Sequence, residues 1–218
     1  MRKDMRFAVA TLCLWCLILL GFRVGFWQSK SFLFLPYNLF LAAIPLFLSE
    51  WAARRSLMRE KIFLGACWLL FFPNAPYLLT DLVHLSLRRG VPLFFFDGLM
   101  LFSYGAAGSI LGFLSLRQMQ NAFFENGCAK LSWVFAITSL FLCSFGIYLG
   151  RVVRLNSWDV ICRPFHLLNS IVSPILNPAA HLSTWAMTFG MGVTLSFGYW
   201  LFTAAGSGKT TRTETVKA

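Results

Sequence analysis

The stretch that decides the fold is residues 62–85, with the sequence IFLGACWLLFFPNAPYLLTDLVHL. A helix needs about 20 predominantly apolar residues to cross the roughly 30 Å hydrocarbon core of a bilayer, so a run of this length predicts a membrane span. Pro73 and Pro76 interrupt the run. Proline lacks a backbone N–H and its ring clashes with the preceding helical turn, so we predict a span that is broken near its middle.

The composition of the whole chain agrees with a membrane protein. Of its 218 residues, 58% are hydrophobic and only 12% are charged, whereas soluble domains have about 25% charged residues. A soluble globular domain is therefore excluded. The net charge of +11 comes from Lys and Arg residues spread over the short loops. This spread is typical of topology signals, so we expect no nucleic-acid partner.

Six apolar stretches predict an all-α integral membrane helical bundle that forms a single domain over residues 1–205. A cytoplasmic N-terminus would place 12 Lys and Arg residues inside and 7 outside. Because Lys and Arg concentrate in cytoplasmic loops, we predict that both termini are cytoplasmic. The predicted transmembrane helices are approximately residues 7–27, 32–49, 62–85, 91–116, 131–150 and 184–205.

Two further segments do not fit a membrane span. Residues 165–177 are apolar but too short to cross, so we expect an interfacial or re-entrant helix on the outer face. Residues 206–218 predict a short disordered cytoplasmic tail. This tail contains GSGKTT, which resembles the end of a phosphate-binding loop. Thr203 stands where the first glycine of that motif belongs, so we expect no nucleotide partner.

The broken span carries the first group of candidate site residues. Asn74 is expected to bond a backbone carbonyl that the prolines leave without a donor. A helix that restarts at Pro76 would place Tyr77, Asp81, His84 and Arg88 on one face. Asp81 and His84 can then share a proton or a divalent metal. The alternative is a proline kink with a polar outer end. No other cofactor is evident.

An acidic residue and a set of glycines mark the fourth span. Asp97 follows three phenylalanines, and a buried acid needs a partner, for which we expect an outer Arg or His84. The alternative is an interfacial Asp that reaches water. We expect Arg23, near the end of the first span, to snorkel to the surface. The glycines of this span are Gly105, Gly108 and Gly112. Small residues allow close helix packing, so we expect the fifth span to pack against these glycines. The alternative is that they form the contact of a homo-oligomer.

The third polar group follows the fifth span. Residues 146–159 read GIYLGRVVRLNSWD, and a helical continuation would place Arg151 and Arg154 on one face. Two arginines suit a phosphate or carboxylate ligand; the alternative is that they anchor the helix end among anionic headgroups. The candidate catalytic residues are therefore Asp81, His84 and Asp97. The candidate substrate-binding residues are Arg151, Arg154, Asn156, Trp158, Asp159, Asn74 and Tyr77.

Three motifs in this order, FFPNAPYLLTDLVHL, FFFDG and GIYLGRVVRLNSWD, resemble the DUF1361 family of uncharacterised multi-pass membrane proteins. The likeness covers roughly residues 62–205. It implies a bacterial protein of the plasma (inner) membrane with a lipid bilayer as its environment. It implies no activity and no catalytic residues.

Three functions follow from these residues. The polar groups lie at the outer ends of three predicted spans, so we expect one outward pocket, with residues 165–177 as its lid. Such a pocket would bind or process a membrane-associated anionic substrate, either a lipid headgroup or a lipid-linked phosphate. The first alternative is a small transporter or permease gated at the Pro73–Pro76 break. The second is a non-catalytic membrane assembly or accessory protein, so enzyme activity is left open.

Overall fold

The computed structural model describes residues 3–27, 31–86, 93–124, 127–155 and 162–207. These residues are helical almost throughout and contain no strand, which confirms the all-α prediction. The chain forms two compact units, Met1–Ala129 and Lys130–Ala218. The single domain expected over residues 1–205 stays a prediction, and the two units are described in turn.

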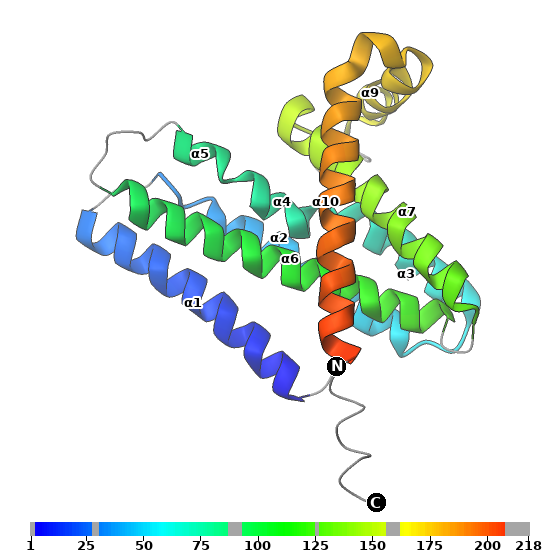
Figure 1. The fold of residues 1–218 in the computed structure, drawn as a ribbon, viewed down its shortest axis with the longest axis horizontal. Coiled ribbons are helices and arrows are strands. Elements are labelled where there is room, and N and C mark those ends of the chain that lie inside the picture. Colours follow the sequence, from blue (N-terminus) through cyan, green and yellow to red (C-terminus); the bar gives the residue numbers. More distant parts are fainter. Residues whose placement is uncertain (1–2, 28–30, 87–92, 125–126, 156–161, 208–218) are drawn as a thin grey trace, which may run out of the picture. The chain divides into compact units, whose positions relative to one another are not determined.

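Unit 1 is built around one long helix (Figure 1). Helix α6 contacts α1, α2, α3, α4 and α5, and two thirds of its most apolar part is buried. It continues eight residues beyond the expected end at residue 116, because polar groups of its last turns face other helices. Ser49 donates to Gln118, and Lys61 donates to the carbonyl of Ala122. The helices of unit 1 are α1 (Lys3–Trp27), α2 (Leu35–Ala53), α3 (Met58–Phe71), α4 (Asn74–Thr80), α5 (Val83–Ser86) and α6 (Phe94–Phe124).

The break in the third span is confirmed, with one correction. Helix α3 ends at Phe71 and α4 begins at Asn74, two residues before the expected restart at Pro76. Pro76 fits there because the first four N–H groups of a helix have no partner inside it. The Asn74 amide donates to the carbonyl of Phe71 at 3.0 Å, as predicted. A second interruption at Asp81 and Leu82 separates α4 from α5.

The glycines of α6 form the seat for α4. At Gly108 an added Cβ would collide with the backbone carbonyl of Ala75, and at Gly105 it would lie 3.3 Å from Cα of Leu79. Only glycine lets two helix backbones approach this closely. These glycines therefore receive α4, the short helix that follows the proline break; packing of the fifth span against the same helix stays a prediction.

Unit 2 contains two long helices and a small core. The side chains of Tyr148, Leu149 and Leu155 are buried against Leu167, Ile171 and Met187, among others. The short helix expected at residues 165–177 is confirmed as α9; its position in the interface stays a prediction. The elements of unit 2 are α7 (Ala129–Tyr148), the π-helix η1 (Leu149–Val153), α9 (Pro164–Leu176), the 3-10 helix η2 (Pro178–His181) and α10 (Leu182–Ser207).

Four helical stretches of the described chain are long and apolar enough to cross a membrane: Lys3–Phe26, Met58–Leu85, Phe94–Phe124 and Ala129–Val153. They match the first, third, fourth and fifth predicted spans. With 19 and 26 residues, α2 and α10 reach about 28 and 39 Å at 1.5 Å per residue. Six spans and cytoplasmic termini stay predictions. Most of the expected disordered tail, residues 208–218, lies outside the described residues.

Candidate functional site

A buried ion pair joins the first and fourth spans. Nε of Arg23 donates to Oδ1 of Asp97 at 2.6 Å, and Nη2 donates to Oδ2 at 3.4 Å. The two side chains are 2% and 0% exposed. Asp97 lies in the first turn of α6, where the peptide dipoles favour a negative charge. The expected pairing of Asp97 with an arginine is confirmed, but the expectation that Arg23 snorkels is wrong, because Asp97 lies within its reach.

Aromatic rings surround this pair. The guanidinium of Arg23 lies 5.9 Å from the centre of the Phe32 ring, a distance at which the face of the ring attracts a cation. Phe22, one residue before Arg23, contacts Phe96, one residue before Asp97, with ring centres 5.8 Å apart. These apolar neighbours keep water away, and the interaction between opposite charges is stronger where the dielectric constant is low.

A second cluster forms around Asp81, which follows the last residue of α4 and is 1% exposed. Nδ2 of Asn38 donates to its Oδ2 at 3.3 Å. Nε2 of His84 lies 3.9 Å from its Oδ1, and the His84 side chain is 34% exposed. The ring of Phe34 lies against His84, with centres 5.3 Å apart. A buried carboxylate thus holds an imidazole that reaches the surface of the unit.

The spacing of residues along the chain predicted one of the two contacts of Asp81 in this cluster. Asp81 and His84, three residues apart, come together as expected. Asn38 and Arg23 are the residues that the sequence did not assign to a site. The available signals were a deep asparagine in the second predicted span and an arginine inside an apolar run.

Asp81 and His84 alone do not make a complete metal site. A zinc site uses three or four protein ligands. The described part of the chain contains no group of three or more His, Cys, Asp or Glu side chains that would hold a metal ion. A divalent metal therefore stays an expectation, and the chemistry below uses only side chains.

The arginines after the fifth span lie on an unusual backbone. Arg151 belongs to the π-helix η1, and the next residue after η1 is Arg154, which has a left-handed backbone with φ 64°. The helix continues after α7 as expected, but as a π-helix that ends at Val153, so a spacing of three no longer places both arginines on one α-helical face. A non-glycine residue in this conformation costs about 1–3 kcal/mol, and such residues cluster at functional sites. Asn156, Trp158 and Asp159 lie outside the described residues, as does Arg88.

The remaining candidates lie on α4. Asn74 caps the end of α3, as described above. Tyr77 is half-buried, and its carbonyl accepts a hydrogen bond from the Thr80 hydroxyl at 2.6 Å. Tyr77 lies four residues before Asp81 and so shares a face with it in a helix.

Comparison with known proteins identifies the family. Residues 37–197 match the family described as "Protein of unknown function (DUF1361)". This chain belongs to DUF1361. The DUF1361 match includes Asn38, Asp81, His84 and Asp97, whereas Arg23 precedes it. No curated protein and no solved structure matches the chain.

Proposed function

We propose that this DUF1361 protein carries an acid–base site at Asp81 and His84 and acts on a membrane-associated anionic substrate, a lipid headgroup or a lipid-linked phosphate. One observation carries the proposal: Asp81 is buried, its two carboxylate oxygens face Asn38 and His84, and the imidazole of His84 is about one third exposed. An oriented imidazole within reach of solvent is the arrangement that general acid–base chemistry uses.

The geometry assigns a role to each side chain. A carboxylate facing Nε2 favours the tautomer with its proton on Nε2, in which Nδ1 is the nitrogen with acceptor character. The 3.9 Å separation is longer than a hydrogen bond, and catalytic contacts commonly tighten when substrate binds. His84 is thus the proton acceptor and Asp81 is the positioning residue. Asn38 restrains Asp81 by holding its other oxygen.

Asp97 takes a different role in this proposal. Both of its carboxylate oxygens face Arg23 in a buried pair, so its negative charge is already balanced inside the protein. We assign it to holding the end of α6 against α1. The catalytic set expected from the sequence is thereby reduced to Asp81 and His84.

Unit 2, taken by itself, carries groups that suit an anionic ligand at a membrane surface. Arg154 is exposed and Arg151 is half-buried, and arginine suits phosphate because its planar fork donates two parallel hydrogen bonds. Helix α9 is strongly amphipathic, as is typical of a helix that lies in the membrane interface. The proposal also includes that the protein is a multi-pass protein of the bacterial inner membrane and that α9 lies at the outer face.

The decisive experiment is substitution in a strain whose phenotype depends on this gene. His84→Ala and Asp81→Asn should each abolish function while the amount of protein in the membrane fraction is unchanged. His166→Ala is the matched control, because His166 is exposed on α9 and has no part in the proposed chemistry. Full function in the His84→Ala strain would refute the acid–base site.

A spectroscopic measurement tests the positioning role directly. The ¹⁵N chemical shifts of an imidazole distinguish its two tautomers. In detergent-solubilised protein, Asp81→Leu, which removes the acceptor, should shift His84 away from the Nε2-protonated form, and the shifts of His166 should not change. An unchanged His84 spectrum would show that Asp81 does not orient the ring.

Orientation can be tested separately. A reporter that is active only in the cytoplasm should be active when fused after Lys217 and silent when inserted at Arg89. The reverse pattern would place the Asp81–His84 site on the inner face and would remove the case for an outer-leaflet substrate.

A small transporter is the second candidate, and the divided third span favours it. Broken helices near buried polar groups are the usual binding sites of transporters, and here the break at Pro73 lies within eight residues of the buried Asp81. Purified protein in sealed vesicles separates the two functions. A transporter changes the amount of solute inside the vesicles. An enzyme alters a lipid and leaves the solute content inside the vesicles unchanged.

A further inference from the structure

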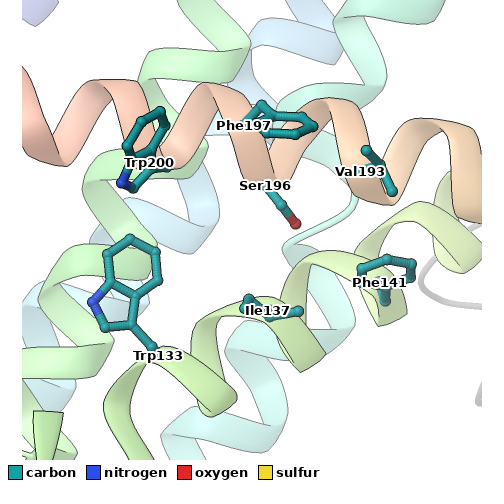
Figure 2. Close-up of a pocket in the computed structure, with 7 residues that line it drawn as sticks. All are labelled: Trp133, Ile137, Phe141, Val193, Ser196, Phe197 and Trp200. Atoms are coloured by element: carbon teal, nitrogen blue, oxygen red, sulfur yellow. The ribbon is translucent and has the colours of Figure 1, made fainter. Parts of the chain in front are cut away.

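Helices α7 and α10 of unit 2 enclose an apolar groove of about 540 Å³ (Figure 2). Trp133, Ile137 and Phe141 line it from α7, at intervals of four residues. Ser196, Phe197 and Trp200 line it from α10, together with Val193. These intervals place each set on one face of its helix. The groove is therefore formed by two matched helix faces within a single unit.

Both ends of the groove are defined by contacts. At one end Phe141 rests on Gly192, where an added Cβ would lie 2.8 Å from its ring, and Phe141 also meets Phe189. At the other end the ring of Trp133 lies 5.9 Å from that of Tyr199. Trp133 and Phe141 are eight residues apart, so the groove extends about 12 Å along α7.

The lining has almost no polar character. Ser196 carries the single polar group other than the indole nitrogens, and its hydroxyl donates to the carbonyl of Gly192 within α10. Ile137 and Phe197 are 44% and 62% exposed, so the groove is open at its side. An occupant must therefore be apolar along its length, and α7 belongs to a stretch that can cross a membrane.

The volume of the groove lies within the range of ligand pockets, roughly 300–1,000 Å³. A flexible hydrocarbon chain can enter such a groove through its open side. Lipid tails are as apolar as these side chains, so retention of a chain depends on van der Waals contact with rigid walls. Such walls come from the four large aromatic residues that line the groove on both sides, Trp133, Phe141, Phe197 and Trp200.

The tryptophan end of the groove has a nearby positive charge. Trp133 and Trp200 lie at the same end (Figure 2), and tryptophan is enriched at headgroup depth. Lys130 is exposed and lies three residues before Trp133, one turn further along the same face of α7. An ammonium group in that position attracts a phosphate.

We propose that the groove between α7 and α10 binds one acyl chain of an anionic membrane phospholipid, with the headgroup of that lipid at Lys130. The site lies entirely within unit 2 and does not depend on the proposed chemistry of Asp81 and His84. The lipid in this groove would be bound specifically, unlike the many lipids that merely surround the helices.

Photo-crosslinking tests the chain site. The full-length protein is placed in vesicles that contain phosphatidylglycerol with a photoreactive diazirine on one acyl chain, and labelled peptides are identified by mass spectrometry. Peptides of α7 and α10 that line the groove should carry at least about fivefold more label than those of α1, a preference of about 1 kcal/mol. Equal labelling of all helices, or crosslinked dimers without lipid adduct, would overturn the proposal.

Variants that fill the groove provide the control. Ser196→Trp should abolish the excess label on α7 and α10. Thr194→Trp is the matched control, because Thr194 is exposed outside the lining and its hydroxyl makes the same type of bond, to Gly190 of its own helix. Ile137→Trp fills the groove from the opposite helix and covers a failure of Ser196→Trp to fold. Unchanged labelling in the folded filling variants would refute the site.

The headgroup is tested with a second probe. Phosphatidylcholine with the same photoreactive chain should label the groove less than phosphatidylglycerol does, and Lys130→Gln should remove that difference. Equal labelling by both lipids in the wild-type protein would overturn the assignment of an anionic headgroup at Lys130.

Discussion

The two ends of unit 1 hold their ion pairs in opposite ways. Arg6 and Glu50 are 3.1 Å apart at one end, and the Arg6 side chain is half exposed. Arg23 and Asp97 are 2.6 Å apart at the other end, where both are buried. The two arginines are 17 residues apart on α1, about 26 Å at 1.5 Å per residue. Similar chemistry at the two ends therefore has different consequences, because only the buried charges lack water as an alternative partner.

Removal of one buried partner should have the largest effect on stability. Arg23→Leu leaves the carboxylate of Asp97 buried without its main counter-charge, and such changes cost about 3–5 kcal/mol. Chemical unfolding in detergent micelles measures this loss. The double variant Arg23→Leu with Asp97→Leu should recover much of it, because no unpaired charge remains. A double variant no more stable than Arg23→Leu alone would show that the pair is not the cause.

Loss of the hydrogen bond to Asp81 should have the second-largest effect on stability. Asn38→Leu removes the amide that donates to Oδ2 of Asp81, and a hydrogen bond to a charged group contributes about 1.5–3 kcal/mol. The free energy of unfolding should fall by that amount under the same conditions. Asn121→Leu, at an exposed position on α6, serves as the control and should change stability much less. Equal losses in the two variants would contradict a special role for the buried cluster.

The seat of α4 gives a third, smaller effect. Gly108→Ala places a methyl group against the carbonyl of Ala75; overpacking costs roughly 1–3 kcal/mol, offset by up to about 1 kcal/mol from the helix propensity of alanine. Unfolding should become easier, and the function that depends on Asp81 should weaken because α4 carries that residue. Gly21→Ala in α1, where nothing lies within 4 Å, should be neutral or stabilising. A neutral Gly108→Ala would show that α4 can shift without cost.

Removal of the exposed ion pair should have the smallest effect on stability. Glu50→Gln removes the pair with Arg6 and the 4.0 Å contact with Arg54. Exposed pairs typically contribute about 0–1 kcal/mol, so the unfolding free energy should change by less than about 1 kcal/mol, and by still less at high salt. A loss as large as that of Arg23→Leu would mean that the two ends do not differ.

The sequence predicted features whose cause lies within one or two helical turns. The break at Pro73, the capping of Phe71 by Asn74 and the meeting of Asp81 with His84 all depend on residues three or fewer positions apart. Proline and asparagine impose these arrangements through their own chemistry, whatever packs around them. The positions of the first, third, fourth and fifth predicted spans also followed from apolar length alone.

Pairings between distant helices could not be predicted in the same way. Arg23 lies near the end of an apolar run, where snorkelling and burial fit the sequence equally well, and only the fold brings Asp97 to it. The glycines of α6 signal a close contact but do not specify its partner. Arg154 gave no sign of its left-handed backbone, because that conformation is usually reserved for glycine or asparagine.

The separation of Arg23 and Asp97 also affects how the protein is made. The two residues are 74 positions apart, so at about 5–20 residues per second a ribosome adds the aspartate roughly 4–15 s after the arginine. We expect the first helix to enter the bilayer during that interval, with its cation and without the carboxylate. Arg23 is four residues from the end of α1, close enough for its long side chain to reach the headgroups. We therefore expect α1 to be held temporarily by the lipid surface and to be drawn inward only when α6 arrives.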